Sequence, residues 1–337
     1  VAGEGGAPLA VAFRDAARSV TLTRMAPRHV SMLRCPATRE PLSLLGNELV
    51  TPGQENRYAV TASGIPCLLP PDTSEDARRQ MAHYDEHLVR QYSENLAYPH
   101  TEEYMAYLDR CLEKEIRPRD LESVAELCCG MGEVLKLFGT KARFGVGVDV
   151  SIPMLEMARR AGSDRPEYLY VQGDATRLPL DDACVDTVLM LGGVHHVSDR
   201  RALFAEVARV LRPGGRFLFR EPASDFFLWR AIRAVVYRLS PALDAETERP
   251  LLWQETVPVL RASGLELVSW KTYGFLGFCF FMNSDVLVFN RLFRFIPGIR
   301  AITRLAARVD DLTTSLPGLR RSGLQVVGVA TKPGGSA

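Results

Sequence analysis

The residues of this chain best suited to chemistry are glycines and carboxylates that follow short apolar runs. Gly130 and Gly132 come directly after the run that ends at Leu127, Asp149 ends the next run, and Asp174 follows the third. Glycine is favoured where a backbone turns sharply or approaches a ligand closely. A carboxylate at the end of the second run can accept hydrogen bonds from ribose hydroxyls. The spacing therefore predicts a nucleoside-containing ligand.

The neighbouring residues narrow the choice of ligand. The dinucleotide fingerprint needs a third glycine at position 135, which is Leu135, and the Gly-Lys-Ser/Thr of a phosphate-binding loop does not occur. A ligand with a ribose and an adenine but no pyrophosphate fits better. The Asp174 carboxylate would then accept a hydrogen bond from the adenine amino group.

Candidates for proton transfer lie after the fourth and fifth runs. His195 and His196 follow the fourth run, and Glu221 ends the fifth. Histidine changes its charge near neutral pH and is the commonest proton-transfer side chain. The alternative for the two histidines is a structural role, and for Glu221 a capping or surface role. Both interpretations stay open at this point.

Positioning these residues together requires a parallel sheet, and the chain alternates accordingly. Helical patterns at Glu133–Phe138, Pro153–Ala161 and Arg201–Leu211 separate the apolar runs. This alternation predicts a doubly wound α/β sheet, in which the carboxyl ends of the strands share one edge. The predicted strands are Ser123–Leu127, Phe144–Asp149, Glu167–Gln172, Val185–Leu191 and Arg216–Glu221, with Leu265–Tyr273 and Leu324–Thr331 later in the chain.

Five motifs in this order resemble the class I S-adenosylmethionine-dependent methyltransferase family. The resemblance implies a Rossmann-like, mostly parallel seven-stranded sheet with an antiparallel last strand, S-adenosyl-L-methionine as cofactor, and methyltransferase activity. One departure is Cys128, where the family has its first glycine; we expect a small side chain to be tolerated there. The motifs are Glu126–Gly132, Val148–Leu155, Gly173–Ala175, Asp186–His196 and Leu211–Gly215.

The resemblance also implies a cofactor site. Asp149 would hold the ribose hydroxyls, and Met154 would pack on the adenine. Leu191 would offer its carbonyl to the methionine ammonium, and the glycines would pass under the methionine. The alternative for Asp149 and Asp174 is that they only cap helices. The implied set is Glu126, Cys128, Gly130, Gly132, Asp149, Val150, Met154, Asp174, Ala175 and Leu191.

The flanking sequence divides into further segments. We expect an unassigned segment (1–31), a small β module (32–71), a helical lid (72–118), the methyltransferase core (119–274), an aromatic helical insertion (275–322), and a final strand with a tail (323–337). The β module resembles a degenerate Trm112 or zinc-ribbon segment. A tetrahedral zinc site needs four ligands, whereas the module offers Cys35 and Cys67 and has Thr38 at the paired position. We therefore expect it to hold no metal.

Aromatic residues in the lid and the insertion are candidates for substrate contact. Tyr84 and Tyr92 lie in the predicted lid, where they would cover the site or simply pack. Phe278 and Phe281 belong to the Phe-rich insertion, which would form a wall for a bulky apolar substrate. Additional core or a dimer contact is the alternative.

Composition limits the classes of partner. Lys and Arg total 41 and Asp and Glu total 40, a net charge of +1, which disfavours a nucleic-acid partner. Seven scattered cysteines predict reduced thiols and a cytoplasmic location. We expect no transmembrane segment; peripheral membrane contact and a homodimer stay open. The predicted function is methylation of a bulky apolar small molecule. The alternatives are an rRNA base methyltransferase and a cofactor-retaining enzyme that does not methylate, such as a natural-product cyclase.

Overall fold

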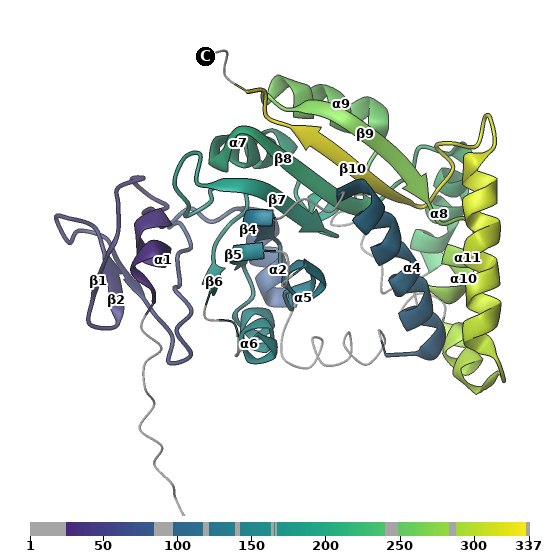
Figure 1. Ribbon diagram of the computed structural model, residues 1–337, viewed down its shortest axis with the longest axis horizontal. Helices are drawn as coiled ribbons and strands as arrows, with labels where there is room; N and C mark the ends of the chain where they lie inside the picture. The colour runs from purple at the N-terminus through teal and green to yellow at the C-terminus, as the bar shows by residue number, and fades with distance from the viewer. Residues whose placement is uncertain are drawn as a thin grey trace, which may run out of the picture.

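A seven-stranded sheet with the order β6-β5-β4-β7-β8-β10-β9 organises the chain (Figure 1). The computed structural model describes residues 25–83, 97–116, 121–138, 142–162, 165, 167–239, 249–282 and 288–334. The strands are β4 (Leu121–Leu127), β5 (Ala142–Asp149), β6 (Tyr168–Gln172), β7 (Val185–Leu191), β8 (Leu211–Pro222), β9 (Glu266–Tyr273) and β10 (Gln325–Thr331).

The pairing of the strands confirms the predicted fold. β4 pairs in parallel with β5 and β7, and β10 runs antiparallel to both β8 and β9. Successive residues of a strand point to opposite faces of a sheet. On β6, Leu169 and Val171 accordingly join one core cluster, and Tyr168 and Tyr170 join the other.

Helices cover both faces of the sheet (Figure 1). α7 (Arg200–Val210) and α9 (Trp253–Ala262) lie on one face, and α5 (Glu133–Phe138) and α6 (Ile152–Ala161) lie on the other. Leu203 and Phe204 of α7 and Leu260 of α9 pack into the first core cluster. Two cores separated by the sheet hold the strand ends in fixed relative positions.

The N-terminal module contains α1 (Pro27–Met32) and an antiparallel sheet of β1 (Ser43–Leu45), β2 (Glu48–Val50) and β3 (Arg57–Ala59). Cys35 is buried, with its Sγ 3.1 Å from the Tyr58 hydroxyl oxygen and accepting from the Thr38 amide. Among the described residues, no group of three or more His, Cys, Asp or Glu side chains is arranged to hold a metal ion. The segment after β3 runs beside β6, where Gln172 and Leu68 are hydrogen-bonded.

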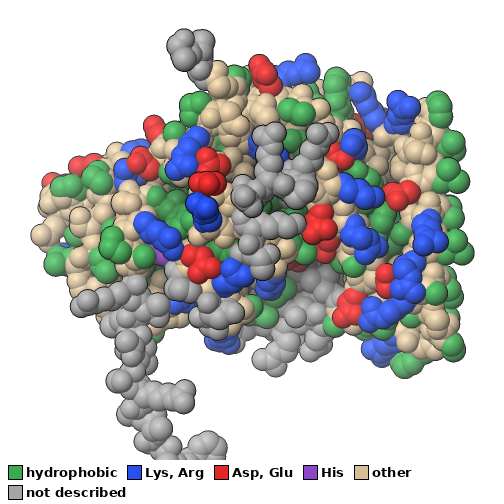
Figure 2. Space-filling view, in the orientation of Figure 1, with side chains coloured by type: hydrophobic (Ala, Val, Ile, Leu, Met, Phe, Trp, Pro, Cys, Tyr) green, Lys and Arg blue, Asp and Glu red, His purple; other side chains and the backbone are tan. Residues whose placement is uncertain are grey.

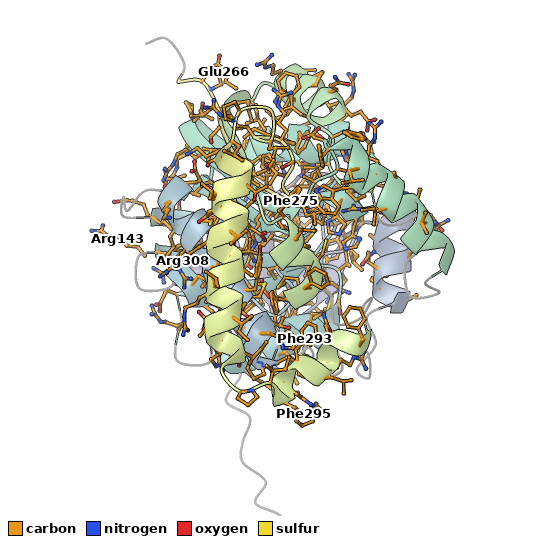
Figure 3. The ribbon with its side chains drawn as sticks, turned by 90° about the vertical axis from the view of Figure 1, so that its right-hand side faces the viewer. Arg143, Glu266, Phe275, Phe293, Phe295 and Arg308 are labelled. Atoms are coloured by element: carbon orange, nitrogen blue, oxygen red, sulfur yellow. The ribbon has the colours of Figure 1, made fainter. Side chains whose placement is uncertain are left out.

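A helical subdomain lies at the other end of the sheet (Figures 1 and 3). It comprises α4 (Pro99–Ile116), α8 (Phe227–Leu239), α10 (Leu276–Phe281), the 3-10 helix η2 (Val288–Phe295) and α11 (Ile299–Ser315). The buried Asp310 of α11 accepts hydrogen bonds from the Tyr104 hydroxyl and from the amides of Gly277 and Phe278. These bonds join α4, α10 and α11. None of the described helices is long and apolar enough to span a membrane.

Candidate functional site

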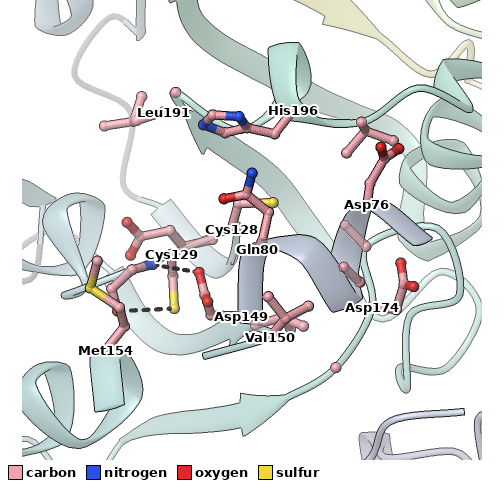
Figure 4. Close-up of a pocket in the computed structure, with 18 of the residues that line it drawn as sticks. Asp76, Gln80, Cys128, Cys129, Asp149, Val150, Met154, Asp174, Leu191 and His196 are labelled. Carbon is pink, nitrogen blue, oxygen red and sulfur yellow. Dashed lines mark hydrogen bonds between the residues drawn. The ribbon is translucent and has the colours of Figure 1, made fainter. Parts of the chain in front are cut away.

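A pocket opens at the carboxyl ends of β4, β5, β6 and β7, and α2 (Glu75–His83) covers part of it (Figure 4). It encloses about 1020 Å³ of empty space, the solvent at its mouth included. The sheet side of the wall comprises Glu126, Cys128, Cys129, Gly130, Met131, Glu133, Val148, Asp149, Val150, Met154, Gly173, Asp174, Ala175, Thr176, Leu191, Gly192, His196 and Val197.

The turn after β4 contains three residues with a left-handed backbone conformation. Gly130 and Gly132 have φ values of 48° and 73°, and Cys128 has a φ of 48°. A left-handed φ costs a non-glycine residue roughly 1–2 kcal/mol. The expectation that Cys128 is tolerated because it is small was therefore incomplete, since backbone conformation also matters there. Gly132 is not a lining residue, and a Cβ at this position would lie 3.1 Å from the Tyr170 hydroxyl.

Asp149 connects β5 to this turn. Its Oδ2 accepts from the Gly130 amide at 2.8 Å, and its Oδ1 accepts from the Ser151 amide at 2.8 Å. Burial raises the pKa of the Asp149 carboxyl, and the amide hydrogen bonds only partly oppose that increase. A carboxylate has about four acceptor positions. Asp149 can therefore hold the turn and still accept hydrogen bonds from a ligand.

Asp174 occupies the equivalent position after β6 and is buried. Its Oδ1 accepts from the Thr176 amide and hydroxyl, and its Oδ2 accepts from the Ser74 amide at 2.9 Å. The second contact joins the sheet edge to the segment that leads into α2. Asp174 thus shapes its own turn and positions the covering helix.

An apolar surface lies beside the two carboxylates. The Ser151 side chain caps α6 by accepting from the Met154 amide, and Met154 itself is buried. Val150, Met154 and Ala175 all line the pocket. Figure 4 shows Leu191 and His196 across the pocket from Asp149 and Met154. The wall near the carboxylates can therefore hold a flat aromatic group.

The two histidines after β7 have different surroundings. Glu221 is fully buried, and its carboxylate accepts from the amides of Gly193 and Val194 and lies 2.8 Å from His195 Nδ1. His195 and Glu221 are not lining residues, whereas His196 is. The two imidazole rings lie 3.9 Å apart, centre to centre. Glu221 and His195 thus fix the turn that presents His196 to the pocket.

Four lining residues that were not predicted from the sequence belong to helix α2 and the residue before it: Ser74, Asp76, Ala77 and Gln80. Asp76 accepts from the Ser198 amide at 2.7 Å and from the Ser198 hydroxyl, and it lies 3.4 Å from the Arg249 guanidinium. Burial alone would raise the pKa of Asp76, but the Ser198 hydrogen bonds and the Arg249 charge outweigh burial and lower it. Asp76 therefore attaches α2 to the turn after β7, and we call its contacts with Ser198 and Arg249 the latch. Its sequence neighbourhood gives no local signal of this contact, because Ser198 is distant along the chain.

The lining has a marked charge imbalance. Asp76, Glu126, Glu133, Asp149 and Asp174 contribute carboxyl groups, and no lysine or arginine is among the described lining residues. Such a pocket attracts a cation and repels phosphate groups. A dinucleotide or nucleoside triphosphate would place several negative charges beside these carboxyl groups, with no lysine or arginine among the described lining residues to pair with them.

Four aromatic candidates lie elsewhere or outside the description. Phe278 and Phe281 are buried in the core of the helical subdomain with Tyr104 and Trp229, and they are not lining residues of the pocket. Their positions agree with the alternative that they form additional core, and not with a wall of this pocket. Tyr84 and Tyr92 lie outside the described residues.

Comparison with known proteins agrees with this geometry. A methyltransferase-domain family matches residues 125–219. A demethylmenaquinone methyltransferase from Mycolicibacterium vanbaalenii is 33% identical over 174 residues, which are 47% of this chain and 73% of that protein. A ubiquinone/menaquinone biosynthesis C-methyltransferase from Caulobacter vibrioides is 34% identical over 123 residues, 33% of this chain and 49% of that protein. The chain thus spans about half the length of the second relative.

A solved structure supports the fold independently. A chain of the complex between the Haloferax volcanii Trm112 methyltransferase activator and a methyltransferase aligns with a TM-score of 0.51 at 19% identity. The alignment covers 77% of this chain and 99% of that chain.

Proposed function

The chain belongs to the class I S-adenosylmethionine-dependent methyltransferases, and from this premise we propose that it methylates a bulky, apolar, quinone-like small molecule. The observation that carries the proposal is the acidic pocket at the carboxyl edge of the sheet. S-adenosylmethionine bears a sulfonium and an ammonium against one carboxylate, so a wall whose described residues include five carboxyl groups and no lysine or arginine suits it.

The residues present fit this cofactor at each of its parts. Asp149 has acceptor capacity left for the ribose hydroxyls, and Asp174 for the adenine amino group. Met154 and Val150 would pack against the adenine, and the Ala175 amide would donate to it. The main-chain turn at Gly130 and the Leu191 carbonyl would meet the methionine part. Glu126 supports the turn by accepting from the Val134 amide at 2.9 Å.

The protein contributes positioning and water exclusion. When bound, the cofactor supplies an electrophilic methyl group for an in-line displacement. Holding the acceptor in line supplies most of the catalysis in such a reaction. Helix α2, held by Asp76 and by the Ser74 amide, closes one side of the pocket against water.

We assign different roles to the residues after β7 and β8. His196 lines the pocket and is the side chain placed to take a proton from an acceptor hydroxyl or an acidic carbon. His195 and Glu221 act as positioning residues, because their contacts fix the turn 193–196 from behind. Substitution of His196 would then affect turnover, whereas substitution of Glu221 would affect folding and cofactor affinity together.

The relatives favour the substrate class. The two relatives described above are named for quinone methylation, and a quinone precursor is both bulky and apolar. A nucleic-acid substrate is disfavoured by the net charge of +1, which gives the chain no general excess of basic residues for a phosphate backbone.

The test is transfer of a labelled methyl group. Purified protein would be incubated with methyl-labelled S-adenosylmethionine and, separately, with a short-tailed demethylmenaquinone analogue or total RNA. We expect label in the quinone, loss of transfer in Asp149→Asn, and normal transfer in the control Asp182→Asn, whose side chain is exposed and pairs with Arg209. Label in RNA alone would overturn the substrate class. Conversion of a substrate without methyl transfer would overturn the reaction.

A further inference from the structure

The exposed apolar side chains of the molecule are concentrated on the helical subdomain. Apart from Leu44, Leu45 and Val268, every large exposed hydrophobic side chain among the described residues lies in α8, α10, η2 and α11 or directly beside them. Single exposed hydrophobic residues are normal on protein surfaces, but a contiguous apolar patch usually marks an interaction site. This concentration therefore needs an explanation.

The densest part is a ridge formed by η2 and α11, which we define by its exposed residues Phe289, Leu292, Phe295, Ile296, Ile302, Leu305, Val309 and Leu312. On α11, the exposed positions 302, 305, 309 and 312 follow the spacing of one helical face. The opposite face is buried through Ile299, Thr303 and Ala307. Figure 2 shows green side chains along the right-hand edge, where Figure 1 places α11.

Positive charge accompanies this apolar ridge. Arg300 and Arg304 of α11 lie on its α4 side, where they pair with Glu102 and Glu103. Arg308 continues the row one turn later and projects sideways from α11 (Figure 3). The arginines of residues 288–324 are Arg291, Arg294, Arg300, Arg304, Arg308, Arg320 and Arg321.

Negative charge is almost absent from the same segment. Its acidic residues are Asp310, which is buried, and Asp311, which accepts from the Tyr107 hydroxyl. α8 likewise contains arginines and no acidic residue. A helix with an apolar face beside a row of arginines is typical of segments that lie in the interface of an anionic membrane.

We propose that the η2–α11 ridge docks on the surface of an anionic lipid bilayer. The apolar side chains would enter the boundary between headgroups and acyl chains, and the arginines would contact lipid phosphates. A second copy of the chain fits less well, because it would bring against this surface another one in which arginines outnumber acidic residues seven to two over residues 288–324. A spanning insertion is excluded for the described helices.

The subdomain is joined to the pocket by charged contacts. Arg220 of β8 is buried, lies 2.6 Å from Asp109 of α4, and lies 3.7 Å from the pocket-lining Glu133. Helix α4 in turn packs against α11. Docking through the ridge would thus hold the pocket at a fixed height above the membrane, where an apolar substrate is dissolved.

Vesicle co-sedimentation of the full chain tests the proposal. Vesicles of phosphatidylcholine alone would be compared with vesicles containing phosphatidylglycerol, at low and high salt. We expect binding to the anionic vesicles, weakened by salt and at least tenfold weaker on neutral vesicles. Arg308→Gln should lower the partition coefficient about fivefold. Leu305→Ser with Leu312→Ser should lower it at least tenfold.

The matched control is Leu44→Ser with Leu45→Ser, which removes exposed leucines from the N-terminal module. Circular dichroism would establish whether each variant is folded. If the double leucine variant is unfolded, the binding of Arg308→Gln still tests the proposal. Absence of binding to anionic vesicles, or equal binding by the ridge and control variants, would overturn the proposal. The proposal would also be overturned if the parent protein formed a dimer, did not bind vesicles, and became monomeric only when the ridge leucines were substituted. Methyl transfer is not measured here, so this result is independent of the proposed reaction.

Discussion

The latch between α2 and the turn after β7 allows a quantitative prediction for Asp76→Ala. The substitution removes the two hydrogen bonds from Ser198 and the contact with Arg249. It leaves α2 attached to the sheet through the Ser74 amide and Asp174. If α2 closes the pocket as proposed, the variant should bind S-adenosylmethionine more weakly without unfolding.

The size of the loss follows from the contacts. A hydrogen bond to a charged group contributes about 1.5–3 kcal/mol, but Ser198 is exposed even though the Asp76 side chain is only 14% exposed. We assign about 1 kcal/mol of stabilisation to each hydrogen bond from Ser198. We assign none to the contact with Arg249, because its guanidinium is partly exposed and more distant. The sum of about 2 kcal/mol corresponds to a roughly 30-fold increase in the dissociation constant.

Isothermal titration calorimetry with S-adenosylmethionine measures this directly. The control is Glu75→Ala on the same helix, whose exposed side chain contacts only arginines of α2 in the described structure. Because the pKa of Asp76 is lowered from 3.8, the charged latch persists above that pH and is lost only as the pH falls through the lowered value. The difference should therefore be constant from about pH 8 to pH 5. If the dissociation constant of Asp76→Ala lay within threefold of the parent value, the proposal that α2 closes the pocket through Asp76 would be refuted.

Three further predictions concern the turn residues. Glu221→Gln replaces one acceptor oxygen with an amide and should lower the free energy of unfolding by about 2 kcal/mol in urea titrations, with the pH–rate profile unchanged; a shifted profile would indicate a proton-transfer role instead. Cys128→Gly should raise the free energy of unfolding by up to about 1 kcal/mol, because glycine adopts a positive φ without strain; a lower melting temperature would contradict this. Since burial raises the pKa of Asp149 above 3.8, acidification should weaken cofactor binding by protonating it, at pH values where an ordinary aspartate is still charged. A flat pH dependence of affinity would count against its role.

Much of the sheet could be predicted because its strands carry local signals. β7 and α5 have the predicted bounds, because the periodicity of apolar residues follows their burial. β8 begins earlier than predicted, at Leu211, because Leu211 also pairs with Val185 of β7, and residues 212–215 form an irregularity within that pairing. The carboxylates at the strand ends followed from topology, which gathers such residues at one edge.

The misses depend on contacts between distant residues. Asp76 accepts hydrogen bonds from Ser198, and Asp310 accepts one from Tyr104. These partners are too far apart in the sequence for local patterns to predict the contacts. The predicted helical insertion 275–322 is divided into α10, η2 and α11, and Gly298 with a φ of 74° precedes α11. Periodicity also could not tell which of two adjacent histidines faces the pocket, because the outcome depends on Glu221 behind the turn.

The contact between the N-terminal module and β6 has a consequence for solubility. Strand β6 is at the end of the large sheet, and the residues just after β3 pair with it, as the Gln172 amide donates to the Pro66 carbonyl and the Leu68 amide donates to the Gln172 carbonyl. An uncovered edge strand is a template for strands of other molecules. The module therefore covers the carboxyl end of this edge at Gln172, a task that needs no zinc ligands. We expect a chain without this module to expose that end of the edge and to self-associate more readily.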